Sequence, residues 1–196
     1  MRIIAGRLKG RRLARVRGPM RPTADRVREA VFNILGPVIL GARVLDLFAG
    51  AGALGIEALS RGAGDAVFVE NHRISLQILR RNLILCGLDQ VSSVLPLSVA
   101  RALPKLAGQG RCFDLVFLDP PYGRGMAAAT LMQLATTGIV APTGRVIVEH
   151  SRQEDLEETY RSLVYMDQRR YGGTLISFYA SRSNESSDLP EEQGDN

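Results

Sequence analysis

Short apolar runs and helical segments alternate along the chain from residue 42 onward. The apolar runs predict strands over residues 42–47, 66–70, 91–95, 115–118 and 145–149. Unbroken runs of Val, Leu and Phe are typical of strands that are buried on both faces of a parallel sheet. The helical stretches between these runs supply the crossovers that parallel strands need. The alternation therefore predicts a doubly wound, Rossmann-like α/β fold with a mainly parallel sheet.

Two further strand-like runs, residues 163–170 and 174–180, complete the pattern. They flank Tyr171-Gly172-Gly173, and such a short connection permits an antiparallel hairpin but no helical crossover. With the earlier runs, they predict a seven-stranded sheet that is mainly parallel and ends in an antiparallel hairpin. The length of 196 residues fits one domain with a small appendage.

The beginning of the chain has a different pattern, in which short β-prone runs are interrupted by glycine. It predicts a small, basic, hairpin-like β extension over residues 1–20. Thr23 is then expected to cap a helix. The apolar face of that helix recurs at helical spacing: Val27, Ala30, Val31, Ile34 and Leu35. We expect the main domain over residues 21–181 and a disordered acidic tail over residues 182–196.

Basic residues are concentrated near the start of the chain. Residues 1–28 carry nine arginines and Lys9 against one acid, and 23 of the 25 basic residues of the chain are arginine. Because the guanidinium group grips phosphate bidentately and stacks on bases, this bias favours a nucleic-acid partner. A solvated basic face on a protein from an arginine-rich proteome would give the same counts, so charge alone leaves both interpretations open.

Other features narrow the class of protein. No apolar run reaches the ~18–20 residues that a membrane span needs, and no apolar signal-peptide segment follows the first residues. Cys86 and Cys112 form no metal-binding motif, so we expect reduced thiols, a cytoplasmic protein and no bound metal. His72 and His150 stand alone among polar neighbours, and we expect ordinary surface or strand-end roles for both.

The tetrapeptide Asp119-Pro120-Pro121-Tyr122 directly follows an apolar run. Open α/β sheets bind their ligands at the carboxyl ends of their strands, and the two prolines would end this strand. The Asp119 carboxylate and the Pro120 carbonyl can accept hydrogen bonds from one exocyclic amine. Tyr122 can stack on the base that carries this amine, a contact worth ~1–3 kcal/mol. The alternative is a structural role, in which Asp119 accepts local backbone bonds in a Pro-Pro turn.

A glycine loop joins the first strand of the main domain to its helix. Gly50 and Gly52 allow close approach to a ligand, and Gly55 lets the helix pack on the strand. Asp46 would repel a pyrophosphate but attract an amino group, and Glu70 at the end of the next strand is placed to accept from both ribose hydroxyls. A ligand with a ribose and a cationic end but without phosphate fits S-adenosylmethionine. In the structural alternative, Asp46 caps the loop and Glu70 caps the following helix.

Three sequence blocks occur in the order found in one enzyme family. They are Arg21-Pro22-Thr23 with Asp25-Arg26-Val27-Arg28-Glu29, then DLFAGAGALGIEALSRGA from Asp46, and then FLDPPY from Phe117. Together they resemble the RsmD-type 16S rRNA guanine-N2 methyltransferases over roughly residues 1–180. The resemblance implies a class I methyltransferase that uses S-adenosylmethionine to methylate N2 of one guanine in small-subunit rRNA, guanine 966 in conventional rRNA numbering.

The resemblance also implies roles for individual residues. Those expected to hold the cofactor are Asp46, Phe48, Gly50, Gly52, Glu70, Asn71, Ser98 and Asp119. Asp119 and Pro120 would orient the guanine amine, and Tyr122 would stack on the base. Those expected to contact RNA are Arg2, Arg7, Lys9, Arg11, Arg12, Arg21, Thr23 and Arg26. Ser98 stands where many related enzymes carry an acid for the adenine amine, and its hydroxyl is a weaker acceptor.

The implied partner is 16S rRNA, within a small ribosomal subunit or an assembly intermediate, and we expect a monomer. Similar tetrapeptides occur in DNA adenine-N6 and protein glutamine-N5 methyltransferases, so these activities remain open. The basic extension argues against a protein substrate, and the lack of an evident target-recognition domain argues against site-specific DNA. A non-catalytic, RNA-binding ribosome assembly factor on the same scaffold is a further alternative.

Overall fold

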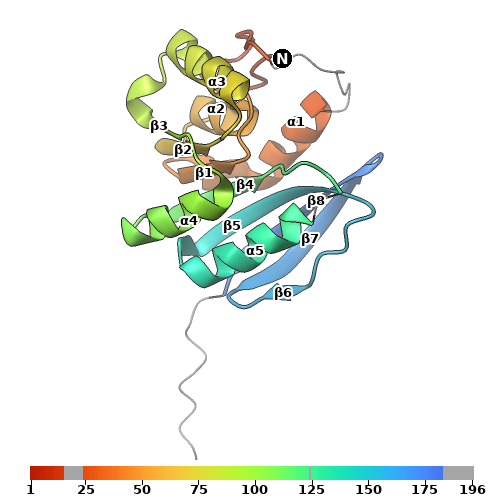
Figure 1. Cartoon of the computed structure of the whole chain (residues 1–196). Coiled ribbons are helices and arrows are strands. Elements are labelled where there is room, and N and C mark those ends of the chain that lie inside the picture. The colour runs from red at the N-terminus through yellow and green to blue at the C-terminus, as the bar shows by residue number, and fades with distance from the viewer. Residues whose placement is uncertain (16–23, 124, 183–196) are drawn as a thin grey trace, which may run out of the picture.

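The computed structural model describes residues 1–15, 24–123 and 125–182. Its sheet, within these residues, has eight strands in the order β3-β2-β1-β4-β5-β8-β7-β6 (Figure 1). The parallel strands are β1 (Arg43–Leu47), β2 (Asp65–Val69), β3 (Ser92–Leu95), β4 (Phe113–Leu118) and β5 (Val140–Ser151). The antiparallel strands that follow are β6 (Thr159–Tyr160), β7 (Leu163–Tyr171) and β8 (Thr174–Ser181).

The expected architecture is confirmed. Each of the seven predicted strands is present, and the last long pair forms an antiparallel hairpin that places β8 beside β5. The additional strand β6 has two residues, which is too short to produce an apolar pattern in the sequence. It extends the antiparallel end of the sheet by pairing with the start of β7.

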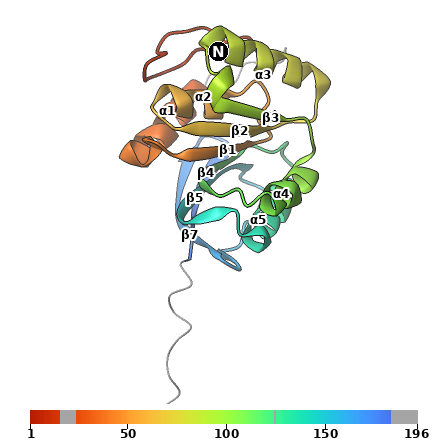
Figure 2. The same ribbon diagram turned by 90° about the vertical axis from the view of Figure 1, so that its left-hand side faces the viewer.

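Helices cover both faces of the sheet (Figure 2). One face packs against α1 (Ala24–Leu35), α2 (Ala53–Ser60) and α3 (Arg73–Cys86), and the other against α4 (Val99–Gly108) and α5 (Met126–Thr137). Short 3₁₀ turns cover Gly36–Ile39 and Asp89–Val91. Because side chains of a strand alternate between faces, Leu115 and Phe117 belong to the first core whereas Val116 and Leu118 belong to the second. This alternation explains why the strand is apolar throughout.

The buried face of α1 is rotated from the predicted one. Val27, Val31 and Leu35 are buried as expected, but Ile34 is 40% exposed. Phe32 takes its place in the core, where its ring centroid lies 5.5 Å from that of Phe117. The expected capping residue Thr23 lies outside the described residues.

The N-terminal segment folds back on itself and packs against α2 and α3. Arg2 and Arg12 form an antiparallel bridge, and Ile3 is buried in the core. The approach is close at Gly6, where the Cβ atom of any larger residue would lie only 1.9 Å from the carbonyl oxygen of Ser60. Asn82 of α3 donates to the carbonyl of Ala14 at 3.0 Å. The described part of this basic segment is therefore docked on the main sheet domain.

Candidate active site

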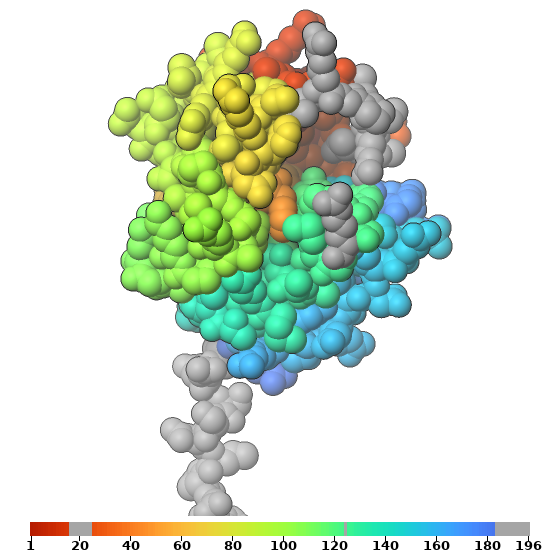
Figure 3. Space-filling view, in the orientation of Figure 1, coloured from red at the N-terminus to blue at the C-terminus, as the bar shows by residue number. Residues whose placement is uncertain are grey.

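A cavity of about 940 Å³ opens at the carboxyl edge of the parallel strands. Its wall includes a residue after each of the first four parallel strands, Phe48, Glu70, Ser98 and Asp119, and also Glu149, which lies near the end of β5. Figure 3 shows this face hollowed between the yellow-to-green part of the chain and the green connection after β4. The cavity therefore lies at the edge where open α/β sheets bind ligands.

Asp46 lies beneath the glycine loop, outside the cavity wall. Its side chain is 2% exposed, and its Oδ2 atom accepts the backbone N–H of Gly55 at 2.9 Å. Burial raises the pKa of Asp46 to about 7, and the negative charge of Glu70 adds to this effect against the opposing Gly55 hydrogen bond. Asp46 thus has the structural role that the sequence left open, which is to cap the glycine loop. A direct contact between Asp46 and a cofactor stays a prediction.

The glycines of the loop have distinct positions. Gly52 is the N-cap of α2 and has a φ of 85°, a left-handed conformation that strongly favours glycine. A Cβ atom on Gly55 would lie 2.4 Å from the ring of Phe68, so this position lets α2 pack on β2. Gly50 donates its N–H to Glu70 at 2.8 Å. None of the three glycines is part of the cavity wall that the described residues form.

Glu70 ties the loop to the start of α3 while it lines the cavity. Its Oε2 atom accepts from Gly50, and its Oε1 atom accepts the backbone N–H groups of Asn71 and His72 at 2.8 and 2.7 Å. A carboxylate has about four lone-pair positions, so these bonds leave capacity for ligand hydroxyls. Glu70 can therefore cap α3 and also bind the ribose, the two roles that the sequence suggested for it.

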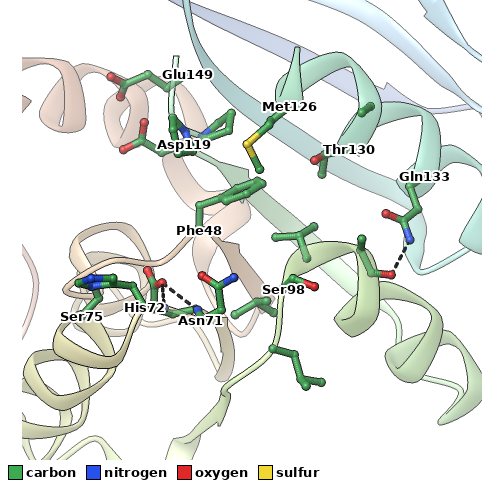
Figure 4. Close-up of a pocket in the computed structure, with 18 of the residues that line it drawn as sticks. Phe48, Asn71, His72, Ser75, Ser98, Asp119, Met126, Thr130, Gln133 and Glu149 are labelled. Carbon is green, nitrogen blue, oxygen red and sulfur yellow. Dashed lines mark hydrogen bonds between the residues drawn. The ribbon is translucent and has the colours of Figure 1, made fainter. Parts of the chain in front are cut away.

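Phe48 and the residues after β3 form the apolar part of the cavity. The Phe48 ring lies near the centre of the cavity in Figure 4, and its backbone has a φ of 61°. Such a conformation costs a non-glycine residue of order 1–3 kcal/mol and is concentrated at functional sites. Leu97 and Val99 flank Ser98, which is the N-cap residue of α4. Asn71 also lines the cavity.

The tetrapeptide after β4 is held by a hydrogen bond to the neighbouring strand. The Tyr122 hydroxyl donates to Oε1 of Glu149 at 2.6 Å and lies 3.2 Å from Oγ1 of Thr174. Burial and this bond to Glu149 raise the pKa of Tyr122 to about 12. The ring is therefore fixed in the wall as a neutral phenol. Asp119 is exposed in the cavity beside it, and Pro120 is buried.

Sequence reasoning missed several residues of the cavity wall. The most significant is Glu149, whose signal was its position at the end of a strand next to the one that precedes Asp119. Met126, Thr130 and Gln133 of α5 also line the cavity. Their pattern marks them only as parts of a helix. His72 lines the cavity. His150 is buried near the end of β5, and its Nε2 atom lies 2.8 Å from Oγ of Ser177, so of the two expected roles it has the strand-end one and not the surface one.

The predicted RNA-contacting residues lie in the N-terminal segment and α1. Those that the structure describes are all exposed: Arg2, Arg7, Lys9, Arg11, Arg12 and Arg26. Arg21 and Thr23 lie outside the described residues. Arg11 also donates to the backbone carbonyl of Leu85 in α3, which anchors this basic loop. Arg2, Arg7, Lys9, Arg11 and Arg12 thus share the docked N-terminal segment, and Arg26 lies in α1. The contact of these residues with RNA stays a prediction.

The described residues contain no group of three or more His, Cys, Asp or Glu side chains that could hold a metal ion. Cys86 and Cys112 are both free thiols. None of the helices in the described ranges combines the length and the apolar character that crossing a membrane requires.

Comparisons with known proteins agree with this geometry. The family model "Conserved hypothetical protein 95" matches residues 1–180. The Bacillus subtilis (strain 168) protein YlbH is 39% identical over 183 residues, which are 93% of this chain and 100% of that protein. Escherichia coli (strain K12) ribosomal RNA small subunit methyltransferase D is 41% identical over 157 residues, which are 80% of this chain and 77% of that protein.

A solved structure of the Escherichia coli protein yhhF has a TM-score of 0.82 and 36% sequence identity, and the match covers 93% of this chain and 98% of that chain. The likeness in fold therefore extends over nearly the whole described chain. The chain belongs to the Conserved hypothetical protein 95 family, the RsmD-type methyltransferases that its three sequence blocks resemble.

Proposed function

We propose that this protein transfers a methyl group from S-adenosylmethionine to the exocyclic N2 of a guanine in 16S rRNA, guanine 966 in conventional numbering. The observation that carries the proposal is the position of the tetrapeptide. Asp119, Pro120 and Tyr122 line the same cavity as Phe48 and Glu70. An amine held at the tetrapeptide and a cofactor held at Glu70 would thus share one space. The names of the curated relatives support rRNA as the substrate class.

The residues of the cavity fit the cofactor. Glu70 would accept from the ribose hydroxyls, and the Phe48 ring with Leu97 and Val99 would provide apolar contacts. Ser98 and Asn71 would hydrogen-bond to the adenine part, and Asp46 would act from beneath the loop on the methionine amino group. The cofactor would supply an activated methyl group on a sulfonium, which needs no metal.

On the substrate side, the Asp119 carboxylate and the Pro120 carbonyl would accept hydrogen bonds from the guanine amine. This arrangement would aim the nitrogen lone pair at the methyl group, and holding two reactants in line supplies much of a rate enhancement. Asp119 would also offset the positive charge that develops on the nitrogen. A strong general base is not required, because the methylated amine is acidic while it is cationic.

A guanine can reach this cavity only when it is out of its stack. Extrusion costs a few kcal/mol, and less in a loop or a single strand, so an exposed rRNA loop is the expected target. The docked basic segment would hold the surrounding phosphates. A small ribosomal subunit or an assembly intermediate as partner, a monomeric state and a cytoplasmic location belong to the same proposal.

The proposal is tested by incubating the protein with labelled S-adenosylmethionine and one of three acceptors. We expect N2-methylguanine in undermethylated 30S subunits and no label in duplex DNA or release factor. Label in DNA adenine or in a release-factor glutamine would overturn the proposal in favour of that activity. Calorimetry with S-adenosylmethionine and with RNA tests the alternative of a non-catalytic assembly factor. That alternative predicts that the protein binds RNA but does not bind the cofactor.

A further inference from the structure

We propose that Glu149 accepts a hydrogen bond from N1–H of the target guanine while Asp119 accepts from its N2 amine, so that the pair selects guanine. This inference deepens the proposed function and rests on it. It adds a recognition residue on β5 that the sequence motifs do not include.

The two carboxylates lie on neighbouring strands at the same level of the sheet. Leu118, the last residue of β4, pairs with Val148 of β5 in parallel register, so Asp119 directly after β4 and Glu149 within β5 are the next residues along the chain. Neighbouring strands are about 4.8 Å apart. Figure 4 shows both side chains at the same end of the cavity and pointing to the same side. Two acceptors are thus presented together, where a planar base could meet both.

Glu149 is held in a fixed orientation. Its Oε1 atom accepts the hydroxyl of Tyr122 at 2.6 Å, and that hydroxyl is also 3.2 Å from Oγ1 of Thr174. Its Oε2 atom accepts no hydrogen bond from the residues that the structure describes. One oxygen therefore anchors the carboxylate to the tetrapeptide, and the other can accept from a ligand.

The surroundings make an unpaired acceptor costly. A second cavity of about 90 Å³ lies against α1 and α2, and Asp119 and Glu149 are the only described residues that line both cavities. Its other walls include the apolar side chains Val27, Leu54 and Ile176 and the buried, cationic Arg28. The apolar part of this wall lowers the local dielectric, which strengthens a hydrogen bond to the Glu149 carboxylate and raises the cost of leaving its second oxygen unmatched.

Guanine is the base whose edge matches this pair. It presents two adjacent donors, N1–H and the N2 amine. Adenine and cytosine present an amine beside a ring nitrogen that is an acceptor, and this nitrogen would face the second carboxylate unfavourably. Asp119 and Pro120 alone would serve any exocyclic amine, whereas the addition of Glu149 would make the site selective for guanine.

The test uses 2-aminopurine, which keeps the C2 amine but has no hydrogen on N1. Small subunits are reconstituted from rRNA that carries guanine or 2-aminopurine at the mapped target, and kcat/KM for methylation is measured with each. We expect the wild-type protein to prefer guanine by roughly 10- to 100-fold, because 2-aminopurine offers no N1–H to Oε2 of Glu149. In Glu149→Gln, the side-chain amide can donate a hydrogen bond to the bare N1 of 2-aminopurine. The preference for guanine should therefore fall to about 3-fold or less, because most of it comes from the single hydrogen bond between N1–H and Glu149.

Two control variants distinguish a role of Glu149 in recognising guanine from a structural role of its bond to Tyr122. Tyr122→Phe removes the anchor of Glu149 but keeps both carboxylates, so it should retain the preference for guanine. Glu158→Gln changes an exposed acid before β6 and should behave as wild type. Cofactor calorimetry on Glu149→Gln checks that the variant is folded.

Equal losses on both bases in Glu149→Gln would overturn the inference and reduce Glu149 to an anchor for Tyr122. An unchanged preference in an active variant would also overturn it, because Asp119 alone would then read both donors. Absence of N2-methylguanine with the wild-type protein would instead overturn the proposed function, and this inference with it.

Discussion

The carboxylate of Glu57 in α2 accepts the backbone N–H of Ile4 at 2.8 Å, although 53 positions separate the two residues in the chain. The same carboxylate accepts from the N–H of Ala5 at 3.0 Å and from Nε of Arg61 at 2.8 Å. Glu57 is only 1% exposed, so it serves as a buried acceptor for donors that the N-terminal segment brings in. The basic loop is therefore positioned by the helix that follows the glycine loop.

Loss of the Glu57 carboxylate should release the N-terminal segment. In Glu57→Ala, the half-buried guanidinium of Arg61 and two backbone donors lose their acceptor, and the buried Arg28 loses an ion-pair partner. Removing one partner of a buried ion pair costs about 3–5 kcal/mol. We expect a decrease of that order in the free energy of unfolding, measured with urea, and faster proteolysis before α1. Glu29→Ala removes an exposed acid of α1 and should leave both unchanged. Unaltered proteolysis in Glu57→Ala would show that other contacts hold the segment.

The exposed basic residues of the docked loop should set the salt dependence of RNA binding. Replacing Arg7, Lys9, Arg11 and Arg12 by glutamine should weaken binding and flatten the plot of log K against log salt. Each lost phosphate contact reduces the slope by ~0.7–0.9.

The control for this variant removes the same charge elsewhere. It replaces Arg101, Lys105, Arg152 and Arg182, which are exposed outside the N-terminal segment. If both variants lose the same affinity, net charge rather than the docked loop accounts for the binding.

The sequence was sufficient to predict seven of the eight strands that the structure describes, but not the contacts between residues that lie far apart in the chain. Apolar runs such as Leu115–Leu118 identify buried strands because both faces of the sheet are covered. The role of Glu149 depends on the register between β4 and β5, which no local pattern contains. The packing of Phe32 rather than Ile34 depends on the distant Phe117, and the docking of the first residues depends on Glu57.

The buried Asp46 should make stability depend on pH in a predictable direction. Burial raises its pKa from the ordinary 3.8 to about 7, so the folded state favours the protonated acid. The stabilisation that comes from this raised pKa is fully present below pH 3.8, where Asp46 is protonated in both states. It is lost as the pH rises to about 7, so the free energy of unfolding decreases over this range. Relative to wild type, Asp46→Asn should therefore gain on the order of 1–3 kcal/mol between pH 5 and pH 8.

Urea unfolding at pH 5 and pH 8 measures this difference without the cofactor. Asp155→Asn, which changes an exposed acid, should show no such gain. A constant difference between wild type and Asp46→Asn at both pH values would mean that Asp46 has the same protonation in the folded and unfolded states.

The ring and the hydroxyl of Tyr122 should contribute separately to catalysis. Tyr122→Ala removes the proposed stacking surface, which is worth ~1–3 kcal/mol per base, and should raise KM for the RNA substrate. Tyr122→Phe keeps the ring and loses the hydroxyl contacts with Glu149 and Thr174, a loss of about 1 kcal/mol or roughly fivefold in kcat/KM. Steady-state kinetics with both variants distinguish these effects. Equal losses in the two variants would show that the ring does not stack on the base.

Asp119 should affect the chemical step more than cofactor binding. It is proposed to orient the amine and to offset charge that develops only during transfer, so removing it should lower kcat by about 10²–10³-fold, as for other groups that stabilise a transition state. Asp119→Ala should still bind S-adenosylmethionine in calorimetry, since Glu70 and Phe48 remain. Asp119→Asn keeps an acceptor oxygen without the charge, so its kcat should lie between those of wild type and Asp119→Ala. Turnover like that of wild type in Asp119→Ala would refute this role, because the Pro120 carbonyl would then hold the amine by itself.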